Sequence, residues 1–300
     1  MASAEPVIGL FDSGVGGLSV LRAVRARLPH ARLLYLADQA HVPYGRRARS
    51  DIVAYARGIT RFLRAQGADL VVVACNTATA AAIDDLRAEF PQVPFVGIEP
   101  AVKPAAQATR TGVIGVLATQ TTFRLPRYAA LVHRFAPHLR VLEDPCPGLV
   151  ERIEAGNLDG PRVRAILRRA VTPMLRAGAD TFVLGCTHYP FVAPALRALV
   201  GPGARILDPA PAVARQVVRV LAAQGLGGNG SAPAGEVRFF TTGHPTRLAA
   251  AVQRLLAWPL RPRVTALRWY SGLDGRLDLR VAQEEREEVR GQGAVARDQG

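Results

Sequence analysis

The chain has 300 residues, 49% of them hydrophobic, a formal net charge of +14 at pH 7 and three cysteines. This is enough for two domains with buried cores, and no run of 18 apolar residues suggests a membrane span. The N-terminus lacks a secretory signal pattern and three cysteines are too few for a disulfide framework, so we expect a cytoplasmic protein with no membrane contact.

Short apolar runs alternate with amphipathic segments along most of the chain. Strands are expected at residues 7–11, 33–37, 70–74, 95–98, 112–117, 141–143, 181–184, 205–207 and 237–241. Helices are expected between them, most clearly at 18–28, 49–66, 79–90 and 246–256. This alternation predicts an α/β fold with mainly parallel sheets, because near-continuous apolar strands are typical of sheets covered by helices on both faces.

Two similar strand-and-helix units predict two α/β domains of like architecture, with the active site in the cleft between them. The first domain is expected to comprise residues 1–97 plus 208–270, and the second residues 98–207. Residues 226–235 are expected to form a surface loop. Residues 271–300 are charged and contain glycine, so we expect a largely disordered tail there.

In each unit, a strand-forming run ends in a cysteine. Val-Ala-Cys-Asn-Thr at 73–77 follows Asp-Leu-Val-Val at 69–72, and Leu-Gly-Cys-Thr-His at 184–188 follows Asp-Thr-Phe-Val at 180–183. Ligands of open α/β sheets bind outside the carboxyl ends of the strands, where both thiols would lie. Two thiols facing each other across one cleft would act as base and acid on opposite faces of one carbon. The pattern therefore predicts a racemase.

The cysteines also have structural and metal-binding alternatives. A cysteine at a strand end is usually a small buried hydrophobe, but the matched surroundings of Cys75 and Cys186 favour a catalytic pair, and a following helix N-terminus favours a thiolate. A disulfide or a metal site is less favoured, because neither cysteine has C-x-x-C spacing or a second nearby ligand, and we expect no metal site. Cys146 lies between two prolines, which favours a structural role.

A glycine-rich string occupies residues 9–18, at the first strand-to-helix turn. Free backbone N–H groups at such a turn can bind an anion. The string is not a dinucleotide fingerprint, because Ser19 replaces the third glycine, and it lacks the ending of a P-loop. Two interpretations stay open: a tight turn capped by Asp12 or Ser13, or a substrate-binding turn that brings Asp12 near a thiol.

Two further features carry weaker signals. His188, two residues after Cys186, is the best candidate for a proton-handling partner, because an ordinary histidine pKa of about 6.5 allows either role near neutrality. A lone histidine is more often a structural residue. Pro-Tyr-Gly at 43–45 looks like a surface turn when taken alone.

Five strings, found in this order, resemble the glutamate racemases of the cofactor-independent aspartate/glutamate racemase superfamily, over about residues 7–243. They are Phe-Asp-Ser-Gly-Val-Gly-Gly-Leu at 11–18, Pro-Tyr-Gly at 43–45, Ala-Cys-Asn-Thr-Ala-Thr at 74–79, Gly-Ile-Glu-Pro-Ala at 97–101 and Gly-Cys-Thr-His-Tyr-Pro at 185–190. The resemblance implies reversible interconversion of L- and D-glutamate, supplying D-glutamate for peptidoglycan synthesis. It also implies that no cofactor is used and that the protein is a homodimer.

The resemblance assigns roles by position. Cys75 would take the α-proton of D-glutamate and Cys186 that of L-glutamate, each thiol reprotonating the face opposite its partner. Asp12 would assist the first thiol, and His188 and Glu154 the second. The residues expected to hold the substrate are Asp12, Ser13, Pro43, Tyr44, Gly45, Asn76, Thr77, Thr119, Thr121, Thr122, Thr187 and His188.

The chain departs from the family pattern in places. Ala-Asp-Gln-Ala-His at 37–41 stands where the family more often has Gly-Asp-Thr and an arginine. Glu151 replaces a common proline, so the choice of Glu154 over Glu151 rests on the spacing to Gly156. The arginine-rich surface and the segment after Ser271 have no counterpart in the resemblance.

Two alternatives remain. An aspartate racemase would differ in the depth of the pocket for the distal carboxylate, which the sequence does not show. A contact with nucleic acid or DNA gyrase is the non-enzymatic alternative, since 37 of the 38 basic residues are arginines. These arginines are scattered along helical faces, which is more typical of a solvated surface than of a nucleic-acid-binding arm.

Overall fold

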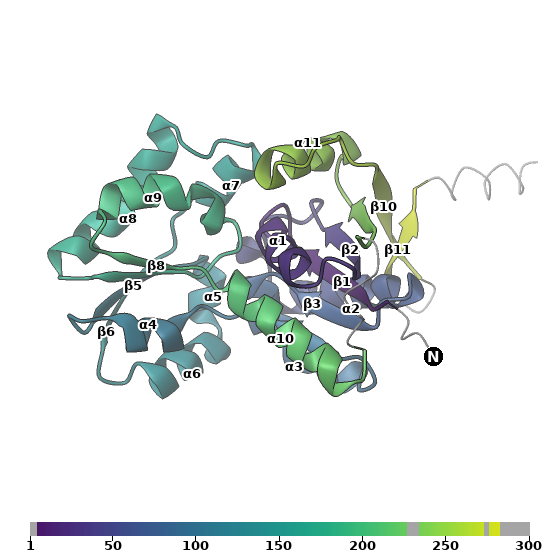
Figure 1. Ribbon diagram of the computed structural model, residues 1–300, viewed down its shortest axis with the longest axis horizontal. Coiled ribbons are helices and arrows are strands. Elements are labelled where there is room, and N and C mark those ends of the chain that lie inside the picture. The colour runs from purple at the N-terminus through teal and green to yellow at the C-terminus, as the bar shows by residue number, and fades with distance from the viewer. Residues whose placement is uncertain (1–4, 227–233, 273–275, 283–300) are drawn as a thin grey trace, which may run out of the picture.

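The computed structural model describes residues 5–226, 234–272 and 276–282, which form two sheets flanked by helices (Figure 1). The strand order is β11-β10-β9-β2-β1-β3-β4 in the first sheet and β6-β5-β7-β8 in the second. Neighbouring strands of the described chain run parallel, except β10 and β11. The expected α/β class with two mainly parallel sheets is confirmed.

The first sheet draws on both ends of the described chain. Its strands are β1 (Val7–Asp12), β2 (Arg32–Ala37), β3 (Leu70–Val73), β4 (Phe95–Gly97), β9 (Val237–Thr241), β10 (Val264–Ser271) and β11 (Leu277–Val281). Its helices are α1 (Leu18–Arg27), η1 (Tyr44–Arg46), α2 (Arg49–Ala65), α3 (Asn76–Glu89), α10 (Ala210–Ala223) and α11 (Pro245–Leu256). Alternate residues of β1 enter two cores, Ile8 and Leu10 on the α1 side, and Val7 and Phe11 on the α2 side.

The second sheet is built from the middle of the chain. Its strands are β5 (Val113–Leu117), β6 (Arg140–Asp144), β7 (Thr181–Leu184) and β8 (Arg205–Leu207). The helices are α4 (Val102–Ala108), α5 (Gln120–Arg124), α6 (Pro126–Phe135), α7 (Leu149–Glu154), α8 (Pro161–Arg176), η2 (Tyr189–Val192) and α9 (Ala193–Val200). These strands lie between residues 113 and 207, whereas the domain boundaries at 97/98 and 207/208 stay a prediction.

An aspartate before each thiol-bearing strand fastens a neighbouring segment. Asp69 accepts a hydrogen bond from the backbone N–H of Val7 at 2.8 Å. Asp180 accepts from the Thr109 hydroxyl and the Arg110 N–H, both at 2.7 Å. Partial burial opposes ionisation of Asp180, but these hydrogen bonds outweigh it and lower its pKa. These two aspartates, which precede the thiol-bearing strands in similar sequence contexts, thus fix the amino-terminal ends of β3 and β7, opposite the thiols.

The expectation of a disordered tail from residue 271 is wrong for residues 277–281. These residues form β11, which pairs with β10 and packs against α2. The Arg61 guanidinium donates to Asp278 at 2.6 Å and to the Leu277 carbonyl at 2.8 Å. Asp278, a charged residue that interrupts the apolar pattern of this strand, is therefore also a residue that attaches the strand to α2. Residues 283–300, and 227–233 of the expected loop, lie outside the described residues.

None of the helices in the described ranges combines the length and apolarity needed to cross a membrane.

Candidate active site

Both predicted thiols lie at the carboxyl ends of their strands and line one cavity. Cys75 follows β3 and Cys186 follows β7, so each comes from a different sheet. Both are 6% exposed. The cavity volume is about 10 Å³, close to the space of one water molecule. The two sulfur atoms therefore share an enclosed space between the sheets.

Cys75 caps helix α3. Its Sγ accepts a hydrogen bond from the Ala78 N–H at 3.4 Å, and the helix begins at Asn76, three residues earlier than expected. Burial, together with the charge of Asp12, raises the pKa of Cys75 well above its ordinary value, although N–H groups of Ala78 and Ser13 oppose this. In this closed conformation Cys75 is a neutral thiol that can donate a proton.

Cys186 has a different partner. Its Sγ lies 3.7 Å from His188 Nδ1, and His188 Nε2 lies 2.6 Å from Glu154 Oε1. Burial opposes a charged imidazole, but hydrogen bonds to Cys186 and Glu154 raise the pKa of His188 well above its ordinary value. Burial likewise opposes ionisation of Glu154, but its hydrogen bond with His188 lowers its pKa. The pair is therefore charged and places a cation beside the second sulfur.

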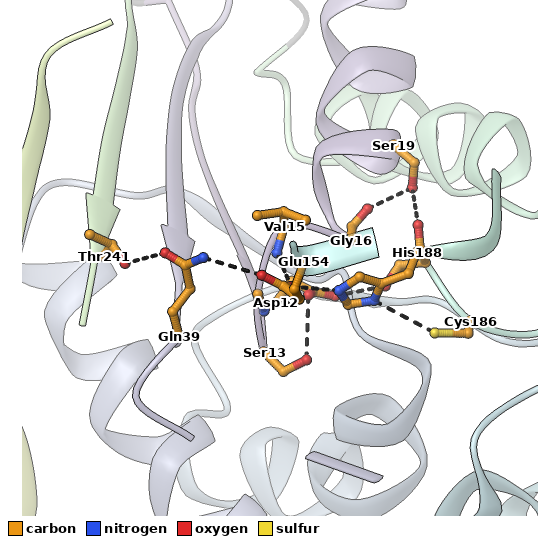
Figure 2. Close-up of polar contacts among 12 residues, drawn as sticks. Asp12, Ser13, Val15, Gly16, Ser19, Gln39, Glu154, Cys186, His188 and Thr241 are labelled. Atoms are coloured by element: carbon orange, nitrogen blue, oxygen red, sulfur yellow. Dashed lines mark hydrogen bonds and ion pairs between the residues drawn. The ribbon is translucent and has the colours of Figure 1, made fainter. Parts of the chain in front are cut away.

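A chain of hydrogen bonds continues behind this pair (Figure 2). Gln39 Nε2 donates to Glu154 Oε2 at 3.2 Å, and the Thr241 hydroxyl donates to Gln39 Oε1 at 2.9 Å. Gln39 is one of the residues that departs from the family pattern. Here it joins α7, a helix beside the second sheet, to β9 of the first sheet. The chain of hydrogen bonds that positions His188 therefore links the two sheets.

The glycine-rich turn holds the two carboxylates of the site. The N–H groups of Gly14 and Val15 donate to Asp12 Oδ1 and Glu154 Oε1 at 2.8 and 2.7 Å. A Cβ at Gly14 would overlap Glu154, and one at Gly16 would lie 2.5 Å from His188 Nδ1. The turn therefore binds anions, as the sequence suggested, but these N–H groups bind the protein's own side chains.

Asp12 lies behind the cavity. It is fully buried, and its Oδ2 accepts from the Thr187 hydroxyl at 2.8 Å. Desolvation by burial raises the pKa of Asp12, although the nearby His188 charge partly offsets this. Asp12 thus orients Thr187 and sets the local charge near Cys75.

Polar groups from both sheets meet at the opposite wall. The hydroxyls of Thr77, Thr119 and Thr122 lie 2.8 to 3.2 Å from one another, and the Thr121 hydroxyl donates to the Gly45 carbonyl at 2.7 Å. Beside them, the Asn76 side chain is buried, and neither its nitrogen nor its oxygen has a partner among the described residues. This amide is available to a ligand in the cavity.

The turn at residues 43–45 is not the simple surface turn that the string alone suggested. Tyr44 is 1% exposed and donates to Asp38 Oδ2 at 2.7 Å. Asp38, also fully buried, accepts from the Thr242 hydroxyl at 2.7 Å and from Trp269 Nε1 at 2.9 Å. The C-terminal hairpin therefore positions a turn of the cavity wall.

The structure separates the predicted residues into two groups. Those that line the cavity are Ser13, Pro43, Tyr44, Gly45, Cys75, Asn76, Thr77, Thr119, Cys186, Thr187 and His188. Asp12, Thr121, Thr122 and Glu154 are instead hydrogen-bonded to residues of that wall. Val150 also lines the cavity and was missed, because an apolar residue gives no chemical signal. Cys146 is buried but does not line the cavity.

Comparison with known proteins identifies the family. Residues 18–217 match the model of the Asp/Glu/hydantoin racemase family. The glutamate racemase of Pseudomonas aeruginosa is 54% identical over 248 residues, which cover 83% of this chain and 93% of that protein. The chain belongs to the glutamate racemase family.

Solved structures of glutamate racemases share the fold. That of a Bacillus anthracis isoform has a TM-score of 0.78 and 31% identity, covering 87% of this chain and 97% of that one. The Escherichia coli glutamate racemase in complex with L-glutamate has a TM-score of 0.74 and 32% identity, covering 84% and 95%. This racemase and its relatives thus have the same architecture over nearly the whole of the relatives' length.

Proposed function

We propose that the protein interconverts L- and D-glutamate by proton transfer between Cα and two thiols. The observation that carries this proposal is the pair of cysteines, delivered by β3 and β7 of different sheets to one cavity. Glutamate is the substrate because the chain is 54% identical to a glutamate racemase, and a related structure holds L-glutamate. Family membership supports a role in supplying D-glutamate for peptidoglycan.

The unequal surroundings of the thiols support different roles for them in each direction of the reaction. In the L-to-D direction Cys186, which lies beside the His188–Glu154 ion pair, acts as the base, and buried Cys75 acts as the acid. The Cys186 thiolate takes the α-proton of L-glutamate and becomes a thiol. Cys75 then gives its proton to the opposite face of the carbanion, forming D-glutamate and leaving a thiolate. In the reverse direction the two thiols exchange roles.

An amino-acid α-proton is far less acidic than a thiol, so the carbanion requires stabilisation. The unpartnered amide of Asn76 and the hydroxyls of Thr77 and Thr187 are positioned to bind the substrate's charged groups. Preorganised dipoles are most effective where water is excluded, as in this nearly closed cavity. Substrate entry requires the two walls to separate, because about 10 Å³ cannot hold glutamate.

Assembly and location follow as further proposals. We propose a cytoplasmic homodimer, as the family resemblance implies, with glutamate as its small-molecule ligand. Contact with DNA gyrase or nucleic acid is a separate proposal that rests only on the charge of +14. Retention on DNA that falls with salt, compared with and without residues 283–300, tests it independently of catalysis.

Solvent isotope incorporation tests the central proposal. In D2O with no added cofactor, conversion of L-glutamate should place deuterium at Cα of the D-glutamate product, because Cys75 exchanges its proton with solvent. Cys75→Ala and Cys186→Ala should each lose racemisation, whereas Cys146→Ala, which changes a buried thiol outside the cavity, should keep it. Full activity in either of the first two variants refutes the two-thiol mechanism. Faster deuteration of aspartate than of glutamate would instead reassign the substrate.

A further inference from the structure

The segment that crosses from the first sheet to the second carries a family string that the proposed reaction does not use. This string is Gly-Ile-Glu-Pro-Ala at 97–101, between β4 and α4. Ile98, which is buried, donates its backbone N–H to the Thr79 hydroxyl at 3.1 Å, and this hydroxyl donates to the Val73 carbonyl at 3.0 Å. The crossover is therefore fastened to α3, the helix that begins directly after Cys75.

The side chain of Arg127 joins this crossover to helices beside both sheets. Its Nε donates to Glu99 Oε1 at 2.7 Å, and its Nη1 lies 3.3 and 3.2 Å from the two carboxylate oxygens of Asp84. Arg127 belongs to α6, beside the second sheet, whereas Asp84 belongs to α3, beside the first. Isolated surface ion pairs contribute little to stability, but this guanidinium is only 32% exposed and is held by two carboxylates at once.

The chain around Arg127 also packs on α3. Leu125, between α5 and α6, is 8% exposed and belongs to the same hydrophobic core as Ala78 of α3. The Thr122 hydroxyl of α5 lies 3.2 Å from the hydroxyl of Thr77, the second residue of α3. A segment beside the second sheet thus lies against the helix that carries one wall of the thiol cavity.

Arg127 is also a near neighbour of the buried amide in that wall. Asn76 and Arg127 line a further enclosed cavity of about 10 Å³, together with Thr122 and Glu99. Asn76 lines the thiol cavity as well, whereas Arg127, Glu99 and Asp84 do not. The guanidinium therefore lies directly behind the substrate-binding wall, where it can set the position of α3 relative to α5 without contacting the substrate.

We propose that Arg127 is a positioning residue for the racemisation site. By joining Glu99 to Asp84, it holds the α3 wall at the distance from α5 that the closed cavity requires. The role rests on the proposed racemase function, and its effect is on KM. When the bridge is lost, the closed arrangement is less populated, so more of the binding free energy is used to bring the walls together. The thiols and the His188–Glu154 pair keep their contacts, so kcat stays close to that of wild type.

Initial-rate kinetics with L- and D-glutamate test this role. Arg127→Gln removes the charge that both carboxylates share, so KM should rise by about three- to tenfold in both directions while kcat stays within about twofold. Arg127→Lys keeps the charge but lacks the planar fork, and its KM should lie between those of wild type and Arg127→Gln. Arg124→Gln is the matched control, an exposed arginine of α5 that lines neither cavity, and should leave KM unchanged. An unchanged KM in Arg127→Gln, or a fall in kcat alone, refutes the positioning role.

A double-mutant cycle tests whether Arg127 acts through the crossover. Glu99→Gln should raise KM by about two- to threefold in the wild-type background and cause no further rise in Arg127→Gln, because the partner charge is already absent. Equal rises in the two backgrounds refute the bridge. If Arg127→Gln does not fold, Arg127→Lys and Glu99→Gln test the same prediction. Wild-type protein without racemase activity would refute the proposed function, whereas an active wild type with an unchanged KM in Arg127→Gln refutes only the positioning role.

Discussion

The carboxylate of Glu154 allows a quantitative test of the charge placed beside Cys186. Glu154→Gln keeps an oxygen that can accept from the Val15 N–H and from His188 Nε2, but removes the negative charge. A hydrogen bond to a charged group contributes about 1.5–3 kcal/mol, against about 0.5–1.5 for a neutral one. Replacing the charged bond by the neutral one costs the difference, about 1–1.5 kcal/mol, which shifts the equilibrium away from the imidazolium by roughly 5- to 13-fold. We expect kcat to fall by that factor.

The same substitution predicts a pH-dependent loss of stability. The pKa of His188 is raised in the folded state, so its stabilisation is complete below the ordinary value of 6.5 and is lost as the pH rises through the folded-state pKa. The pKa of Glu154 is lowered, so its contribution is present above 4.5 and is lost as the pH falls through the folded-state pKa. The variant should therefore be destabilised most between about pH 4.5 and 6.5, and less at alkaline pH.

Kinetics, isotope effects and thermal melting together provide the assay. L- and D-glutamate have equal free energies in water, so the variant must lower kcat/KM equally in both directions. The primary isotope effect should increase with α-deuterated L-glutamate, because the Cys186 step becomes slower. Glu151→Gln is the control, since Glu151 lies on the same helix but pairs with exposed Arg46 at 2.6 Å. Wild-type kcat in Glu154→Gln, or a stability loss that does not change with pH, would refute the reasoning.

Two further substitutions test the walls of the cavity. Gly16→Ala places a Cβ 2.5 Å from His188 Nδ1. The free energy of unfolding, measured in denaturant, should therefore fall by about 1–3 kcal/mol, and kcat should fall as well. Gly203→Ala is the control and should change neither quantity, because no atom lies within 4 Å of the added Cβ. Asp38→Asn leaves one side-chain oxygen for the donors Tyr44, Thr242 and Trp269. The free energy of unfolding should fall by about 1–3 kcal/mol, and KM should rise because Tyr44 is displaced. An unchanged KM in initial-rate measurements would contradict this.

Much of the fold was predictable because buried parallel strands are continuous apolar runs. The strands at 181–184, 205–207 and 237–241 were predicted at their observed bounds, and the two thiols at the ends of β3 and β7. The hairpin of β10 and β11 was not predicted, because its faces are partly exposed and its apolar pattern is interrupted by charged residues.

Long-range contacts explain the rest of what the sequence could not show. Asp38 and Trp269 are separated by 231 residues, and Val15 and Glu154 by 139, yet each pair is joined by a hydrogen bond. No local pattern encodes such pairings, since they depend on how the two sheets meet. For the same reason, the glycine-rich turn could be identified as an anion-binding turn without revealing that its anions are side chains of the protein itself.

The small volume enclosed by the thiols has a consequence for the rate of turnover. Glutamate cannot enter or leave while the hydroxyls of Thr77 and Thr119 remain 2.8 Å apart and the walls meet. Each catalytic cycle must therefore include one opening of the cavity when the substrate enters and another when the product leaves. Raising the solvent viscosity with an inert solute would slow these openings more than the proton transfers themselves. The turnover rate should therefore depend on solvent viscosity.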